Sequence, residues 1–162
     1  MSQRIDPDSD VSTGGFTTTP LWSKIDDGAS TNDADFVTSA SLGAIDDTDT
    51  FEVGLSNPAS TPGSGTNTVT FRAKKTGTAA CDLTVTCMEG ATNRGELTQT
   101  LTTTITTYTF NPTSIGNYSN LTLLFTVIRT GAGTANTGIV YWAKMDIPDA
   151  SAATTYKFFR MF

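Results

Sequence analysis

Residues 98–109 read TQTLTTTITTYT, and eight of these twelve residues are threonine. Leu97, Leu101 and Ile105 recur every four residues, which fits one face of a helix as well as a strand. Threonine is branched at Cβ, so it disfavours helix and suits a pleated sheet. We therefore predict a strand over 96–110. Threonine supplies 33 of the 162 residues, so the same preference extends through the chain.

Alternation of apolar and polar residues predicts further strands on both sides of this stretch. The clearest are Thr50–Leu55, Thr68–Lys75, Cys81–Cys87, Asn120–Arg129 and Gly138–Ile147. We expect about eight strands in one domain, 1–162, and the second and third of those listed to be hairpin neighbours. Because a single open sheet would leave one apolar face in water, the prediction is an all-β, two-sheet antiparallel β-sandwich of jelly-roll type.

In the last of these strands, Gly138–Ile147, the large apolar residues do not all fall on one face. Ile139, Tyr141 and Ala143 alternate on one face together with Met145 and Ile147, and Trp142 falls on the other face. Either Trp142 is exposed or both faces of this strand are covered.

Composition excludes several functions. The net charge is −6 and the pI about 4.4, so we expect no binding to nucleic acid or to a membrane surface. The chain has no histidine, which excludes histidine bases and the commonest zinc and haem sites. Cys81 and Cys87 are too far apart on one strand for a disulfide, so we expect free, buried thiols.

Acidic residues concentrate in the first 52 positions, where eleven are opposed by two basic ones, for a net charge of −9. Asp6–Asp10 begins like an EF-hand loop, but Val11 and Thr17 replace the required glycine and glutamate. Turns are the favoured role of these aspartates, and a calcium site assembled from separate loops stays open. Glu52 and Asp82 face away from the apolar stripes and are expected at the surface. We therefore predict no catalytic residues, no metal site and no cofactor, and hence no enzyme.

Two groups of residues remain as candidates for binding. A sugar-stacking platform is one use of the aromatic side chains, although core packing or protein contact is favoured for each of Trp22, Tyr108, Tyr118, Tyr141 and Trp142. The chain ends are the other group, with a 1–15 arm and an apolar 151–162 tail as candidate docking extensions, although the tail fits a final strand equally well. The predicted partner interface comprises Arg4, Trp22, Phe158, Phe159, Met161 and Phe162.

Several stretches resemble a group of tailed-bacteriophage virion proteins over about residues 4–148. They are RIDPDSD (4–10), GGF (14–16), LWSKIDD (21–27), DADFV (33–37), FEVGLSNP (51–58), TFRAKK (70–75), YSNL (118–121) and WAKMDIP (142–148). The resemblance implies a jelly-roll protein of the virion, and we favour a capsid decoration (cement) protein. Such a protein would bind the major capsid protein at the capsid surface as a dimer or trimer. The alternative is a head-fibre or tail-associated module that binds a host surface or carbohydrate.

Overall fold

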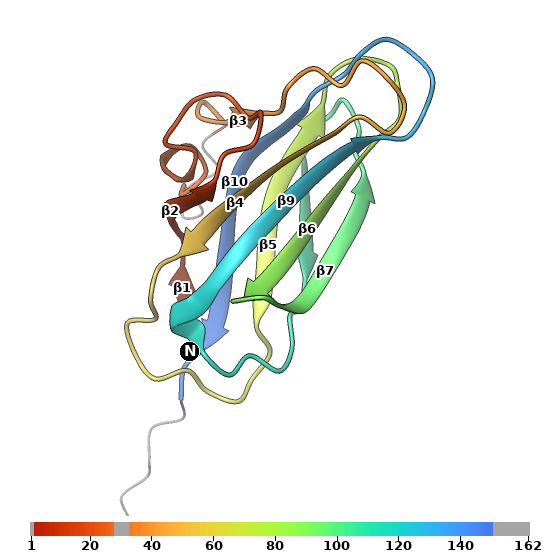
Figure 1. Cartoon of the computed structure of the whole chain (residues 1–162). Coiled ribbons are helices and arrows are strands. Elements are labelled where there is room, and N and C mark those ends of the chain that lie inside the picture. The colour runs from red at the N-terminus through yellow and green to blue at the C-terminus, as the bar shows by residue number, and fades with distance from the viewer. Residues whose placement is uncertain (1, 28–32, 151–162) are drawn as a thin grey trace, which may run out of the picture.

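The computed structural model describes residues 2–27 and 33–150, which form two five-stranded antiparallel sheets (Figure 1). Sheet A consists of β1 (Ser2–Ile5), β10 (Gly138–Pro148), β5 (Thr68–Lys75) and β8 (Thr106–Phe110) in that order, with β3 (Val37–Thr38) paired to β10. Sheet B has the order β2 (Pro7–Ser12), β4 (Thr48–Leu55), β9 (Leu121–Arg129), β6 (Cys81–Glu89) and β7 (Thr92–Thr100). The predicted two-sheet antiparallel sandwich is confirmed.

The chain passes repeatedly from one sheet to the other, as in a jelly roll. β4, β5 and β6 lie in sheets B, A and B, and β8, β9 and β10 lie in sheets A, B and A. The predicted hairpin of β5 with β6 is therefore wrong. β5 instead pairs with β8 and β10, and β6 pairs with β7 and β9.

The threonine-rich stretch contains two strands rather than one. β7 ends at Thr100 in sheet B, and β8 begins at Thr106 in sheet A. Between them Leu101 is buried, and its N–H donates a hydrogen bond to the carbonyl of Cys81 at 2.8 Å. The chain thus changes sheets after Leu101 has packed into the core.

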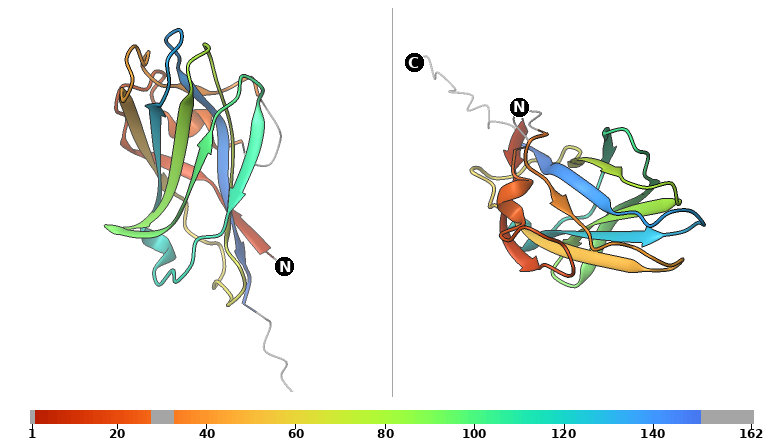
Figure 2. Two further views of the ribbon diagram at one scale, coloured as in Figure 1. Left: turned by 90° about the vertical axis from the view of Figure 1, so that its right-hand side faces the viewer. Right: turned by 90° about the horizontal axis from the view of Figure 1, so that it is seen from above.

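Alternating side chains of the two sheets fill one hydrophobic core. Phe51 and Phe125 stack with ring centroids 4.4 Å apart, and Phe71 meets Phe125 edge-on at 6.4 Å. Phe51 and Phe125 belong to sheet B and Phe71 to sheet A, so these rings join the two layers seen on edge in Figure 2. Two short 3-10 helices are formed by Trp22–Lys24, which lies beside β2, and by Tyr118–Asn120, which leads directly into β9. Within the described residues, no helix has the length and apolar character needed to span a membrane.

A β-bulge in β10 explains why its apolar residues lie on both faces of the strand. Val140 pairs with Ala73 and Trp142 with Arg72, so Tyr141 is an extra residue. Ala143, Met145 and Ile147 join the main core, whereas Ile139, Tyr141 and Trp142 form a second cluster with Ile105. The expectation that Ile139 and Tyr141 share a face with Ala143 is therefore wrong. Trp142 is buried, so both faces of β10 are covered.

The N-terminal residues belong to the sandwich. β1 pairs with β10 and β2 pairs with β4, so one end of the chain contributes an edge strand to each sheet. Residues 2–12 are thus not the separate arm that we expected. The expected tail, 151–162, lies outside the described residues, as do the interface candidates Phe158, Phe159, Met161 and Phe162.

Candidate functional site

A row of four threonines crosses the outer face of sheet B. Thr50 on β4 pairs with Thr126 on β9, Thr126 pairs with Thr84 on β6, and Thr84 pairs with Thr98 on β7. Neighbouring strands lie about 4.8 Å apart, so the row places one hydroxyl at each interstrand step. We call these four residues the threonine row.

Two parallel rows flank it, and the three together define what we call the outer B face. The flanking rows are Glu52–Leu124–Thr86–Glu96 and Thr48–Ile128–Asp82–Thr100. These rows place three carboxylates and two aliphatic side chains around the threonine hydroxyls, with no lysine or arginine. The face therefore combines hydrogen-bonding groups with patches of C–H surface and carries only negative charge.

The hydroxyls on this face keep hydrogen-bonding capacity. Thr84 and Thr98 bond each other, with 2.8 Å between their Oγ1 atoms. A hydroxyl has one donor and two acceptor sites, so this bond leaves one proton and several lone pairs free. Glu52 accepts a hydrogen bond from the hydroxyl of Thr122, which holds its carboxylate on the same face.

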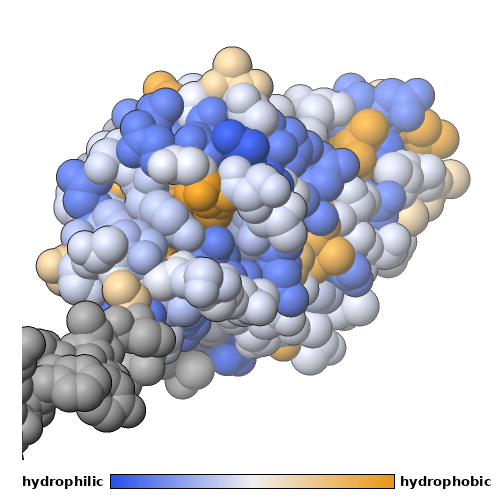
Figure 3. Space-filling model, turned by 90° about the horizontal axis from the view of Figure 1, so that it is seen from below, coloured by the Kyte–Doolittle hydropathy of each residue, from blue (hydrophilic) through white to orange (hydrophobic). Residues whose placement is uncertain are grey.

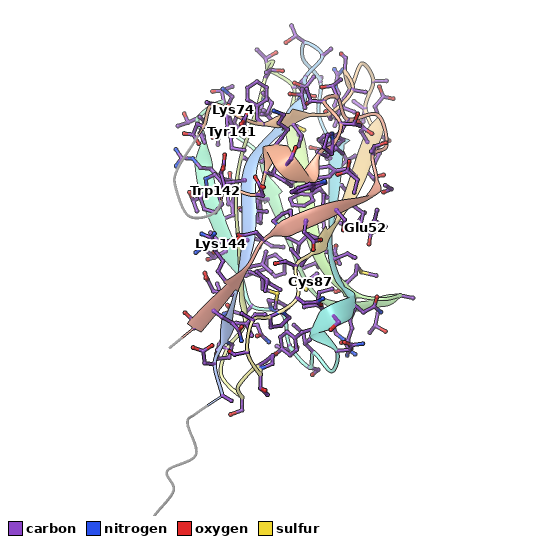
Figure 4. The ribbon with its side chains drawn as sticks, turned by 90° about the vertical axis from the view of Figure 1, so that its left-hand side faces the viewer. Glu52, Lys74, Cys87, Tyr141, Trp142 and Lys144 are labelled. Atoms are coloured by element: carbon purple, nitrogen blue, oxygen red, sulfur yellow. The ribbon has the colours of Figure 1, made fainter. Side chains whose placement is uncertain are left out.

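The outer B face is open to solvent. Thr98, Glu96 and Thr100 are exposed, and the residues on the central strands β9 and β6 are mostly half-buried. No described segment crosses in front of β9 and β6 in Figure 1. Figure 2 shows the end of the β6–β7 hairpin projecting outward from the layer. Figure 4 places Glu52 on the side of the sandwich opposite Tyr141 and Trp142.

The two interface candidates within the described residues lie apart from this face. Arg4 is on β1, opposite Asp146 of β10, and forms an ion pair with Asp6 at 2.8 Å. Burial raises the pKa of Asp6, and the charge of Arg4 opposes this shift. Trp22 is half-buried in the first 3-10 helix and packs against the core. The structure therefore brings neither residue to the threonine row.

The five aromatic residues do not gather on an exposed platform. Trp22, Tyr108 and Tyr118 pack against the main core, and Tyr141 and Trp142 are 4% and 6% exposed. On the outer side of sheet A, Tyr141 contacts the ring of the exposed Phe36, and the Nζ atom of Lys74 lies 5.5 Å from the Tyr141 centroid. Figure 4 shows Lys74 beside Tyr141. This cluster has one exposed ring, which makes it a poor stacking surface for a sugar.

Several aspartates of the N-terminal third hold backbone turns. Asp10 accepts from the N–H groups of Leu21 and Trp22, and Asp47 accepts from that of Ala44. The buried Asp49 accepts from Gly15, Ala40 and Thr50. Within residues 2–27 and 33–150, no three histidine, cysteine or acidic side chains are grouped so as to hold a metal.

The described part of the chain has no pocket. Its exposed large apolar residues, Val11, Phe36 and Ile45, belong to separate segments. Seen from below, small hydrophobic areas alternate with hydrophilic ones (Figure 3). Cys81 and Cys87 are free and buried on β6, as predicted, and burial raises their pKa values to about 11 and about 12. With no pocket in the described residues, a ligand would meet an open surface, and the outer B face presents an ordered array of polar groups on it.

Sequence patterns identify the threonines only as strand formers and do not reveal this row. Its signal is weak but present, since threonine occupies outward positions of four strands. The register that aligns these positions joins strands far apart in the chain.

No protein-family model matches the chain, and no curated protein matches it in sequence. Among solved structures, three examples are similar to the chain at low sequence identity. The structure of TmCBM61 in complex with β-1,4-galactotriose has 11% identity and a TM-score of 0.47, covering 89% of this chain and 86% of the other. The CBM36-1 domain of a multidomain xylanase from the hindgut metagenome of Trinervitermes trinervoides has 13% identity and a TM-score of 0.40, covering 93% and 99%. A CBM4 structure has 16% identity and a TM-score of 0.38, covering 74% and 91%.

Proposed function

We propose that the chain is a non-catalytic module that binds carbohydrate on the outer B face. The observation that carries this proposal is the threonine row, which aligns hydroxyls from four strands on an open surface. Sugars present many hydroxyls and some apolar C–H surface, so their partners combine donors, acceptors and aliphatic groups. Threonine hydroxyls, the carboxylates of Glu52 and Glu96, and the side chain of Leu124 supply these on adjacent rows.

The module would bind by many modest contacts. A hydrogen bond between neutral groups contributes only about 0.5–1.5 kcal/mol, because both partners give up water to form it. An open face also buries less of its ligand than a cleft does. We therefore expect dissociation constants for single chains near the millimolar to micromolar range, about 4–8 kcal/mol of binding free energy.

Affinity electrophoresis of residues 1–162 through gels that contain single soluble polysaccharides tests the proposal. Retardation by at least one polysaccharide, weakened by the free sugar oligomer, is the expected result. The double variant Thr84→Val/Thr126→Val removes two hydroxyls of the row with little change in side-chain volume, so it tests whether the row contributes to the retardation. Equal mobility of the unaltered chain in all gels would contradict carbohydrate binding.

The resemblance to phage virion proteins favours a second candidate, the capsid decoration protein, with the major capsid protein as partner. A decoration protein binds only the assembled shell, so its removal should lower the shell's resistance to heat. Quantitative mass spectrometry of purified virions separates the two roles. Hundreds of copies per particle would favour decoration, and a few copies would favour a fibre or tail module that contacts the host surface.

A further inference from the structure

We propose that the ligand is a single, uncharged, extended glycan chain that lies across the strands of sheet B along the threonine row. This inference rests on the proposed carbohydrate-binding function and adds the class and orientation of the ligand. Three features of the outer B face lead to it: the direction in which its hydroxyls repeat, the sign of its charge and the twist of its sheet.

The hydroxyls repeat at shorter and more regular steps across the strands than along them. Across the sheet, each of four successive strands contributes one threonine, so the steps are about 4.8 Å and the row spans about 14 Å. Along the strands the steps are longer and unequal, about 7 Å from Thr84 to Thr86 on β6 or from Thr98 to Thr100 on β7, and about 13 Å from Thr122 to Thr126 on β9. The sugars of an extended β-1,4-linked glycan repeat at a spacing close to the interstrand distance. A chain that crosses the strands would therefore place about one sugar over each threonine.

The charge of the face excludes acidic glycans. Glu52, Glu96 and Asp82 flank the row, and the three rows contain no basic residue. A uronate or sulfate group laid on this face would meet carboxylates alone, with no cation to pair with. An uncharged chain can instead donate its hydroxyl protons to these carboxylates, in hydrogen bonds stronger than neutral ones.

The twist of the sheet excludes a flat ligand. Adjacent strands rotate by about 20–25° relative to each other. The direction in which the threonine side chains project therefore turns by roughly 60–75° from Thr50 to Thr98. A crystalline polysaccharide surface is flat and would touch only part of such a row. A single chain can rotate about its glycosidic bonds and follow the twist.

Titration calorimetry with uncharged β-linked oligosaccharides of two to six sugars tests the orientation. We expect affinity to rise with length up to about four sugars and then to level off, because the row has four threonines. Thr84→Val and Thr126→Val should each weaken binding of the longest oligomer by about five- to tenfold, as expected for one lost hydrogen bond. Thr107→Val and Thr109→Val, at exposed positions on β8 of the other sheet, are matched controls and should leave affinity unchanged.

The outcomes separate this inference from the function on which it rests. Binding that is unaffected by Thr84→Val and Thr126→Val, or that is complete with two sugars, would overturn the orientation and leave carbohydrate binding in place. Preference for a crystalline or an acidic polysaccharide would overturn the ligand class. Absence of binding to every oligosaccharide and polysaccharide would overturn both. A second variant, Glu52→Gln/Glu96→Gln, should raise affinity for an acidic polysaccharide by removing repulsion.

Discussion

The hydroxyl groups of Thr84 and Thr98 lie 2.8 Å apart across the β6–β7 pair. This bond links an interior strand of sheet B to its edge strand at the end of the threonine row. Threonine is stiff at χ1 because it is branched at Cβ, and this bond further restricts the rotation of the two hydroxyl groups. The row is thereby partly preorganised for a ligand, which lowers the entropy that binding costs.

Loss of this bond should affect stability little. For Thr98→Val we expect the free energy of unfolding to change by less than about 1 kcal/mol, because Thr98 is exposed and valine also favours strands. Urea denaturation followed by tryptophan fluorescence measures this, with Thr100→Val as the control. A loss of several kcal/mol would mean that the hydroxyl pair holds the hairpin together.

The stacked phenylalanines should dominate core stability. Phe125 is fully buried between Phe51 and Phe71, so Phe125→Ala should lower the free energy of unfolding by about 3–5 kcal/mol through lost contacts and a cavity. The exposed Phe36 provides the control, and Phe36→Ala should cost less than about 1 kcal/mol. Equal effects of the two variants in thermal or urea unfolding would contradict this description of the core.

Asp49 should be a structural residue rather than a metal ligand. Its carboxylate is buried and accepts three backbone hydrogen bonds, from Gly15, Ala40 and Thr50. We expect Asp49→Ala to destabilise the chain by about 2–4 kcal/mol, because it leaves buried N–H groups without a partner. Asp46→Asn, at an exposed position, is the control and should be nearly neutral.

A calcium titration of the same proteins addresses the alternative role of Asp49. The melting temperature of the unaltered chain should not rise with calcium, since the aspartates already bind the backbone. A rise that a chelator reverses and that Asp49→Ala abolishes would reassign this carboxylate as a ligand.

The sequence predicted the fold class because alternation is a local property. Strands β9 and β10 are read directly from it, and the need to cover their apolar faces implies a second sheet. The break between β7 and β8 has no such signal, since neither glycine nor proline interrupts TQTLTTTITTYT. The bulge at Tyr141 was also hidden, because one extra residue shifts the phase without changing composition.

The candidate site was less predictable than the fold. Thr50 and Thr126 are direct neighbours across β4 and β9 although 75 residues separate them in the sequence. Local patterns place each threonine on an outward face but do not set the register between distant strands. The aromatic residues gave the opposite error, since their chemistry suits sugar binding but packing buries Tyr141 and Trp142 and partly buries Trp22, Tyr108 and Tyr118.

The buried thiols lead to a prediction of reactivity. Burial raises the pKa of Cys81 to about 11 and that of Cys87 to about 12, and the carboxylate of Glu89 adds to the effect at Cys87. Thiolate is the reactive form, so neither cysteine should react with a disulfide reagent in the folded chain at pH 8. Both should react at once in 6 M guanidinium. Fast reaction of one thiol in the folded state would show that its end of β6 opens readily.

The same shifts predict a loss of stability at high pH. An unfolded cysteine has an ordinary pKa near 9.0, whereas the folded values are about 11 and about 12. Below pH 9 the thiols are protonated in both states and do not make stability depend on pH. Between pH 9 and 12 the unfolded chain releases these protons and the folded chain retains them, so the free energy of unfolding should fall as pH rises. The variant Cys81→Ala/Cys87→Ala lacks both groups and keeps every lysine and tyrosine. Urea unfolding from pH 8 to 11 should therefore show a smaller decrease for this variant than for the unaltered chain, and equal decreases would contradict the assignment.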